Sequence, residues 1–265
     1  MTTILQISDP HVVEPGALVS GRLATDQSLR RLVARLTDML DRIGPVDALL
    51  ISGDVSDDGS AESYAHFKSL MAPFDLPIFV IPGNHDLREP MRQAFGEAGV
   101  LPTTGKLNWH RAIGEVEMIG LDTLIEGHGG GEMDAETLHF LETALATTAD
   151  RPVLLALHHP PFQTNIEFMD RIGLQGIDPL AKILSNHRGE VRAVCGHVHS
   201  MMIASIGGKT AISSPSPCSS FEFDMRLDAP VGFFDHEDGC LLHRWKGGFQ
   251  SIRIAMKAGN GPFPF

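Results

Sequence analysis

Five apolar runs, each followed by side chains that can bind metal, place the strongest constraint on how this chain can fold. The runs are ILQIS, ALLIS, IFVIP, VLLAL and AVC, and their composition is typical of buried β-strands. Open α/β sheets build their sites at the carboxyl ends of the strands. We therefore expect one site at that edge, made by Asp9-Pro10-His11, Gly53-Asp54, Gly83-Asn84-His85-Asp86, His158-His159 and Gly196-His197-Val198-His199.

The segments between these runs carry helical patterns, which predicts a parallel sheet. Apolar residues recur at helical spacing from Leu29 to Ile43 and stop at Gly44-Pro45. A second helical stretch covers residues 60–72, so the first three runs form a β-α-β-α-β unit. We expect the theme to repeat less regularly, with a strand at 116–121, a helix at 134–147, a strand at 153–157, and a further helix and strand ending at Cys195.

The pattern changes after His199. The sequences MIASI-GG-KTAIS and GFFDHEDGCLLHRW each predict a β-hairpin, and the first should extend the sheet. Residues 1–212 would then form the core. Residues 213–265 would supply a cap loop, the closing hairpin of the core and a tail, without being an independent domain. The loop at 213–230 and the tail Pro262-Phe263-Pro264-Phe265 are candidates for a small cap or a homodimer contact.

Composition and charge narrow the choice of partner. The 265 residues carry a formal net charge of −12. Nucleic-acid binding depends on Lys and Arg that neutralise phosphates, so nucleic acid is disfavoured and a small substrate is favoured. The three cysteines, Cys195, Cys218 and Cys240, have no CxxC spacing and are typical of buried apolar residues. The first residues lack a signal-peptide pattern and no apolar run approaches about 18 residues, so we expect a cytoplasmic protein with no membrane span.

The ligand types indicate a metal centre of oxygen and imidazole donors. Asp9 and His11 are two positions apart, so on a regular strand both would point the same way. Gly53 allows close approach to Asp54, whose two carboxylate oxygens can bridge two cations. Asn84 offers an amide oxygen, a neutral metal ligand that has little structural reason to lie in a core. Such a set without thiolates suits Fe, Mn, Co or Zn.

The order of these motifs resembles that of a known family. D-x-H, G-D, G-N-H-D, H-H-P and G-H-x-H follow one another from Asp9 to His199, as in the calcineurin-like metallophosphoesterases. The segments ISDPH, GDVSDDG, IPGNHD, HHPPF and CGHVH are most similar to those of bacterial class III cyclic-nucleotide phosphodiesterases and the related glycerophosphodiesterases. The resemblance implies an α/β fold, a four-layer α/β/β/α sandwich with a small C-terminal cap or extension.

The resemblance also implies two divalent metal ions (Fe, Mn, Co or Zn) and a role for each matching residue. One ion would be held by Asp9, His11, Asp54 and His199, and the second by Asp54, Asn84, His158 and His197. His85 would face the leaving oxygen, oriented by Asp57, while His159 would lie behind the ligands. Substrate contacts are expected from Asn84, His85, Phe162 and His199.

The implied chemistry is attack by a metal-bound hydroxide on phosphorus. Two divalent ions, two carboxylates and one hydroxide leave a single positive charge, which a phosphodiester would neutralise. We therefore expect a dinuclear metal-dependent phosphodiesterase that hydrolyses small phosphodiesters, either cyclic nucleotides or glycerophosphodiesters. The alternatives are a nuclease or a phosphomonoesterase that uses the same site, and a metal-binding scaffold without turnover.

Two positions separate the chain from other branches of that superfamily. Asp57 occupies the place of the tyrosine ligand of purple acid phosphatases, and the only tyrosine is Tyr64. Asp58 occupies the place of the phosphate-binding arginine of phosphoprotein phosphatases. Specificity is less marked in the sequence. The further pocket candidates are Arg22, Asn165 and Met169, while GHGGGE at 127–132 lacks the ending of a P-loop and His128 is expected to be solvated.

Overall fold

Two β-sheets form the centre of the computed structural model, which describes residues 1–261, 263 and 264. The first sheet contains β1 (Thr2–Ile7), β2 (Ala48–Ser52), β3 (Ile78–Ile81), β12 (Gly239–Trp245) and β13 (Phe249–Ala255), in the order β13-β12-β1-β2-β3. The second contains β4 (Trp109–Ile113), β5 (Val116–Gly120), β7 (Val153–Ala156), β9 (Val191–Cys195), β10 (Ile203–Ile206) and β11 (Lys209–Ser213), in the order β10-β11-β9-β7-β5-β4. A small pair consists of β6 (Gly131–Glu132) and β8 (Leu174–Gln175).

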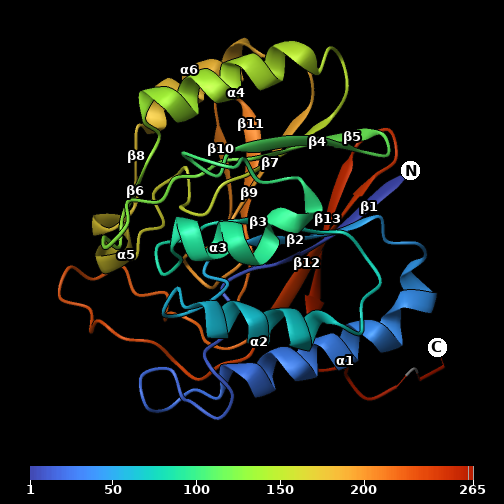
Figure 1. The fold of residues 1–265 in the computed structure, drawn as a ribbon, viewed down its shortest axis with the longest axis vertical. Helices are drawn as coiled ribbons and strands as arrows, with labels where there is room; N and C mark the ends of the chain where they lie inside the picture. Colours follow the sequence, from blue (N-terminus) through green and yellow to red (C-terminus); the bar gives the residue numbers. More distant parts are fainter. Residues whose placement is uncertain (262, 265) are drawn as a thin grey trace.

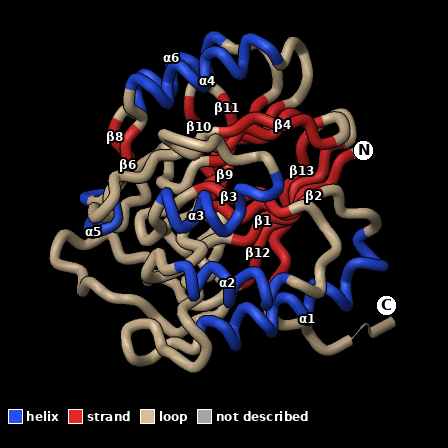
Figure 2. Tube along the Cα trace, viewed as in Figure 1, coloured by secondary structure: helices blue, strands red, loops and turns tan. Residues whose placement is uncertain are grey.

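Helices cover the strands on two opposite sides (Figure 1). On one side lie α4 (Ala135–Thr147) and α6 (Ile177–Asn186). On the other lie α1 (Thr25–Ile43) and α2 (Ala61–Met71), with α3 (Arg88–Phe95) packed beside α2. Figure 2 shows the strands of both sheets between these two groups of helices. A short helix, α5 (Glu167–Arg171), and a 3-10 turn (Gly96–Ala98) complete the helical segments of the described residues.

Alternation along β7 explains how the two sheets pack together. Leu154 belongs to the apolar cluster that also contains Leu5 of the first sheet and Leu29 of α1. Leu155 belongs instead to the cluster that contains Leu141 of α4 and Leu180 of α6. Because successive side chains of a strand point to opposite faces, the second sheet packs on the first with one face and on helices with the other. This is the packing that the expected α/β/β/α order requires.

Most of the predicted elements are confirmed. Strands β1, β2 and β3 pair in parallel, and the amphipathic helix α1 ends at Ile43, immediately before the predicted stop at Gly44-Pro45. Strands β10 and β11 form the first predicted hairpin, which turns at Gly207-Gly208. Through the parallel pair of β11 with β9, this hairpin extends the second sheet as expected.

The second predicted hairpin is wrong. Within GFFDHEDGCLLHRW only Gly239–Trp245 is a strand, and its hairpin partner is Phe249–Ala255 across the turn at Lys246-Gly248. Phe234 makes only an isolated bridge with Ser220. The apolar GFF segment belongs to an exposed loop, whereas the strand β12 is held because it pairs with β1 on one side and β13 on the other. Helix α3, with eight residues, and strand β4, with five, were not predicted from the sequence.

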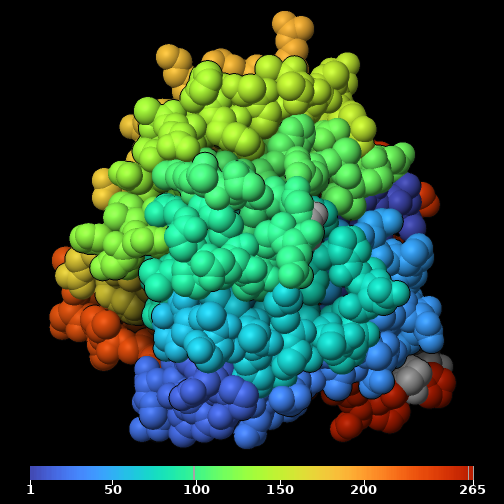
Figure 3. Space-filling view, in the orientation of Figure 1, coloured from blue at the N-terminus to red at the C-terminus, as the bar shows by residue number. Residues whose placement is uncertain are grey.

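The loop after β11 protrudes at the left edge of the molecule, in orange in Figures 1 and 3. The division at residue 213 stays a prediction, although β12 and β13 are strands of the first sheet. Residues 262 and 265 of the proposed tail contact lie outside the described residues. The three cysteines are buried and unpaired, as predicted. None of the helices in the described part of the chain is long and apolar enough to cross a membrane.

Candidate metal centre and active site

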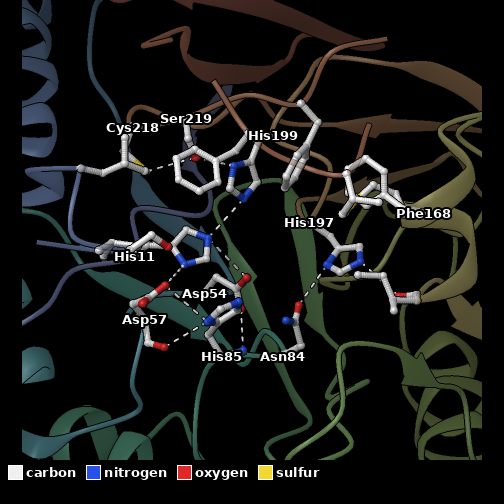
Figure 4. Close-up of a pocket in the computed structure, with 18 residues that line it drawn as sticks. His11, Asp54, Asp57, Asn84, His85, Phe168, His197, His199, Cys218 and Ser219 are labelled. Carbon is white, nitrogen blue, oxygen red and sulfur yellow. Dashed lines mark hydrogen bonds and ion pairs between the residues drawn. The ribbon is translucent and has the colours of Figure 1, made fainter. Parts of the chain in front are cut away.

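The five ligand-bearing segments meet at one edge of the two sheets. Figure 4 shows residues of four of these segments around one cavity. Strands β1, β2 and β3 of the first sheet and β7 and β9 of the second each end two or three residues before a predicted ligand. Five of the seven proposed ligands, all except Asp9 and His158, border a cavity of about 310 Å³. The residues that line it include His11, Asp54, Asp57, Asn84, His85, His197, His199, Phe168, Met169, Ile172, Ser219, Phe221, Val231 and Phe233.

The backbone at the ligands is unusual. Five predicted ligands have a positive φ, which few non-glycine residues adopt: Asp9 (54°), His11 (43°), Asp54 (49°), His197 (70°) and His199 (50°). The expectation that strand alternation turns Asp9 and His11 the same way is wrong, because strand β1 already ends at Ile7. The left-handed turns direct both side chains to the site. Such strain is typical of functional sites.

One group of ligand atoms combines Asp9, His11 and His199. His11 Nε2 lies 3.2 Å from His199 Nε2, and His199 Nε2 lies 3.5 Å from Asp9 Oδ1. The Oδ2 atom of Asp54 lies 3.5 Å from His11 Nε2. All four residues are buried, so these atoms face one small polar space.

A second group surrounds Asn84. The Oδ1 atom of Asn84 lies 2.9 Å from His197 Nδ1 and 3.2 Å from His158 Nε2. His158 Nε2 is in turn 3.5 Å from Asp54 Oδ2. The same carboxylate oxygen of Asp54 is therefore equally far from His11 in the first group and His158 in the second. Its position is the one that a bridging ligand requires.

The outward-facing nitrogen of each histidine is already bonded to the protein. His158 Nδ1 donates to Ser52 O (2.9 Å), and His197 Nε2 donates to Ile172 O (3.1 Å). Because a carbonyl oxygen only accepts, the opposite nitrogen of each neutral ring keeps a free lone pair directed to the group. His11 Nδ1 donates to the Asp57 carboxylate in the same manner, whereas His199 Nδ1 bonds the Ser219 hydroxyl, which can donate or accept. Histidines held this way are suited to metal ligation, so the donor set fits two divalent ions.

Three glycines permit the strand ends to approach so closely. A Cβ at Gly53 would lie 2.2 Å from His158 Nδ1, and one at Gly83 would lie 2.1 Å from Asp54 Oδ1. A Cβ at Gly196 would lie 2.1 Å from Ser8 Oγ and 2.5 Å from Asp9 Oδ2. Each glycine therefore brings backbone from one strand end against side chains from another.

Carboxylates and imidazoles perturb one another in this buried cluster. Burial opposes protonation of His11, but the hydrogen bond to Asp57 and the charge of Asp54 raise its pKa to about 9. Burial likewise opposes protonation of His158, yet the charge and hydrogen bond of Asp54 raise its pKa to about 9. Burial opposes ionisation of Asp54, but His158 and His11 hold the pKa of that carboxyl well below its usual value. In the metal-free protein, protons therefore occupy two ligand positions near neutral pH.

His85 lies at the mouth of the cavity, and its side chain is 40% exposed. Its Nδ1 donates to Asp57 O at 3.0 Å, while the Asp57 carboxylate is 3.4 Å away. That carboxylate is closer to His11, at 3.0 Å. Asp57 thus contacts His85 as expected, but through its backbone, and its carboxylate chiefly holds His11. Asp58 is exposed and accepts from Ser60 N at the start of α2.

His159 lies behind the ligands. Its Nδ1 faces Thr123 Oγ1 at 2.9 Å and its Nε2 faces Gly129 O at 3.2 Å, so both ring nitrogens have protein partners. Burial and the neighbouring His158 lower its pKa to about 3. The neutral ring packs at 4.7 Å from His197, centroid to centroid. His159 therefore supports the site through packing.

The structure does not bring every predicted pocket residue to the cavity. Phe162 packs against the cluster between the second sheet and helices α4 and α6, outside the cavity lining. Arg22, Asn165 and His128 are exposed and also lie outside it. Met169 does line the cavity.

The aromatic wall of the cavity was missed. It is formed by Phe168 in α5 and by Phe221 and Phe233 in the loop after β11. Phe221 lies 4.8 Å from the His199 ring and 5.4 Å from Phe168, centroid to centroid. Ser219, which bonds His199, was also missed. No period marks these loop residues, and the only signal was the clustering of phenylalanine in SSFEF.

Replacing Gly83 by alanine tests the close approach. Gly83→Ala should weaken metal binding about tenfold or more, because its Cβ would displace the Asp54 carboxylate. Isothermal titration with Mn²⁺ measures this change. Gly96→Ala is the matched control, since no atom lies within 4 Å of its added Cβ. Equal Mn²⁺ affinity in both variants would contradict the role assigned to Gly83.

Metal binding should release protons. A metal ligand must be deprotonated, and the pKa values of His11 and His158 are about 9. Filling both sites at pH 7.5 should therefore release about two protons, and affinity should rise with pH up to about pH 9. Calorimetry in buffers of different ionisation enthalpy counts the protons. Asp57→Asn should lower the count, because it removes a group that raises the pKa of His11.

Comparisons with known proteins agree with this geometry. A sequence model described as calcineurin-like phosphoesterase matches residues 2–201. The chain is 30% identical to a probable glycerophosphodiester phosphodiesterase, GpdQ, of Arcobacter nitrofigilis, over 99% of this chain and 96% of that protein. It is 32% identical to the 3',5'-cyclic adenosine monophosphate phosphodiesterase CpdA of Pseudomonas aeruginosa, over 90% of this chain and 87% of that protein.

Solved structures share the fold. A dimetal phosphatase from Danio rerio superposes with a TM-score of 0.70 at 12% identity, covering 97% of this chain and 96% of that one. This likeness concerns the fold alone. From the family match and the two relatives together, the chain belongs to the calcineurin-like phosphoesterase family.

Proposed function

We propose that this protein is a dinuclear metal-dependent phosphodiesterase that hydrolyses small phosphodiesters, either cyclic nucleotides or glycerophosphodiesters. The observation that carries the proposal is the pair of ligand groups that share Asp54 Oδ2 and open into a cavity beside His85. The names of the two relatives, a probable glycerophosphodiester phosphodiesterase and a cyclic-AMP phosphodiesterase, support this substrate class.

The proposed cofactor is a pair of divalent ions, Fe, Mn, Co or Zn. Asp9, His11, Asp54 and His199 would hold one, and Asp54, Asn84, His158 and His197 the other. When bound, such ions supply Lewis-acid activation of water and of the phosphoryl group. The protein's own contribution is to keep the ligands in place, since Asp57, Ser52, Ser219 and Ile172 fix the ring nitrogens.

The charge of the lining favours a diester. Among the described residues that line the cavity there is no lysine or arginine. A phosphomonoester carries up to two negative charges, and the cavity offers no cationic side chain to neutralise the second one. A diester carries a single negative charge. Asp58, where phosphoprotein phosphatases have an arginine, points away to the start of α2. These features weigh against the monoesterase alternative.

His85 would serve the leaving group. Its Nδ1–H donates to Asp57 O, so as a general acid the ring would carry a second proton, at Nε2, to give to the departing oxygen. The backbone N–H of His85 donates to Asp54 Oδ1 at 2.9 Å, which ties this histidine to the bridging carboxylate. A non-catalytic scaffold has no need of a half-exposed histidine in this position.

A nuclease remains the weaker alternative. The chain carries a formal net charge of −12, and nucleic-acid backbones require cationic contacts. The wall opposite the ligands is apolar, with Phe168, Phe221 and Val231, which suits a small organic group.

The loop that supplies Phe221 and Val231 also exposes Phe223, Met225 and Leu227, at 59%, 64% and 82%. Such exposure supports the proposed homodimer contact.

Metal reconstitution tests the proposed function. Metal-stripped protein supplied with Mn²⁺, Co²⁺, Fe²⁺ or Zn²⁺ should hydrolyse bis(p-nitrophenyl) phosphate with a higher kcat/KM than p-nitrophenyl phosphate, because the cavity offers no side-chain cation for a second phosphate charge. Comparing cyclic AMP with glycerophosphocholine then ranks the natural substrate classes. Hydrolysis of neither class with any of the four metals would refute the proposal.

Removing His85 should separate chemistry from metal binding. His85→Ala should lower kcat about 10²–10³-fold, the usual effect of losing a general acid, while Mn²⁺ affinity stays near that of the wild type. Steady-state kinetics and metal titration measure the two effects. His128→Ala, an exposed loop histidine outside the cavity, is the matched control and should leave kcat unchanged. Loss of metal from His85→Ala would assign it to the ligands instead.

A further inference from the structure

Each of the two ligand groups draws on both sheets. In the first, Asp9, His11 and Asp54 follow strands of the first sheet, while His199 follows β9 of the second. In the second, Asp54 and Asn84 follow the first sheet, while His158 and His197 follow β7 and β9. The two sheets are not hydrogen-bonded to each other as neighbours. The geometry of both groups therefore depends on how one sheet is offset from the other.

A buried amide links the sheets directly behind the ligands. Gln6 lies on β1 and is fully buried. Its Nε2 donates to Ser52 Oγ at 2.8 Å and to Cys195 O at 3.0 Å. Ser52 ends β2 two residues before Asp54, and Cys195 ends β9 two residues before His197. One side chain thus joins the last residues of two ligand-bearing strands that belong to different sheets.

The orientation of this amide is itself fixed. His243 Nε2 donates to Gln6 Oε1 at 2.8 Å, and His243 Nδ1 accepts from Ser251 Oγ at 2.9 Å. Arg192 Nη1 donates to Ser251 Oγ at 2.7 Å. Burial, with the nearby Arg192, lowers the pKa of His243 to about 3, so the ring is neutral and has one donor and one acceptor. The bonds run in one direction, and the NH₂ group of Gln6 can only face Ser52 and Cys195.

The network reaches the ligands at Ser52. The Ser52 hydroxyl donates to Ser8 Oγ at 2.7 Å, next to Asp9 in the chain. The carbonyl of the same residue accepts from His158 Nδ1 at 2.9 Å, the bond that leaves His158 Nε2 free to bind metal. Ser52 is thus bonded to the amide of Gln6 on one side and to a proposed ligand on the other.

We propose that Gln6, held by His243, is a positioning residue for the metal centre, setting the offset between the sheet edges that carry the two halves of the ligand set. This inference rests on the proposed function, because it assumes that both ligand groups bind ions. Gln6 contacts neither ion nor substrate. A residue that served stability alone would also satisfy its hydrogen bonds, so the test has to separate metal binding from stability.

Gln6→Met removes the link at nearly constant volume. We expect the affinity for Mn²⁺ to fall about tenfold or more, in the range seen when groups behind metal ligands are lost. Titration calorimetry measures the affinity, and electron paramagnetic resonance of the two-manganese protein reports the coupling between the ions, which a shift of the sheets would change. The unfolding temperature should also fall, because the buried His243 Nε2–H loses its acceptor.

A double variant separates the two effects. In Gln6→Met with His243→Leu both polar partners become apolar, so the unfolding temperature should recover while the Mn²⁺ affinity stays low. In this double variant the polar groups around positions 6 and 243 keep other hydrogen-bond partners. Ser52 Oγ keeps its bond to Ser8, Cys195 O still accepts from Ser214 N at 2.8 Å, and Ser251 keeps Arg192. Leu36→Ala, a buried substitution in α1, is the control that lowers the unfolding temperature without affecting the affinity.

The outcomes are distinct. Wild-type Mn²⁺ affinity and coupling in both Gln6 variants would overturn the positioning role and leave the proposed function standing. An equal loss of affinity in Leu36→Ala would also overturn it, because affinity would then follow stability. A wild-type protein that takes up fewer than two ions would instead refute the dinuclear centre itself.

Discussion

The close approach of two sheet edges, each bearing part of one ligand set, is the constraint on which the centre depends. Gly53, Gly83 and Gly196 make the approach possible, since a Cβ at any of them would overlap a neighbouring side chain. The ligands are accordingly short. Aspartate, asparagine and histidine reach the shared space directly from the strand ends, and their few rotatable bonds leave little freedom to lose when metal binds.

Strain and charge accumulate at the same edge. A left-handed conformation costs a non-glycine residue on the order of 1–3 kcal/mol, and five predicted ligands adopt one. Cross-strand backbone bonds hold the turns, with Asp9 N donating to Gly53 O and His11 N to Asp54 O. Buried carboxylates draw protons onto His11 and His158 when no metal is present. Divalent ions would replace those protons, so the fold is prepared for positive charge rather than for an empty polar pocket.

The convergence of the proposed ligands at one place could be predicted from the sequence for a physical reason. A ligand that follows a buried strand has its place set by sheet register, and register follows from apolar runs that can be recognised locally. Even there the mechanism differed, because Asp9 and His11 converge through positive φ and not through strand alternation. The errors fell where tertiary contacts decide. Phe162 went to the helix-facing core, and GFF in the second predicted hairpin remained a loop because β12 already has two neighbours.

The opposite wall of the cavity is built from a short helix and a loop, not from strand ends. Phe168, Phe221 and Phe233 come from a five-residue helix and from a loop whose base is closed by a single bridge between Ser220 and Phe234. These segments contain none of the strand ends, the three glycines or the Gln6 link, and they touch the ligand rings through the bonds of Ile172 O to His197 and of Ser219 Oγ to His199. Apart from these two bonds, the aromatic wall and the proposed ligands come from different parts of the chain. Because the apolar side chains that face the ligands lie at residues 168–172 and 219–234, the search for specificity starts with these two segments.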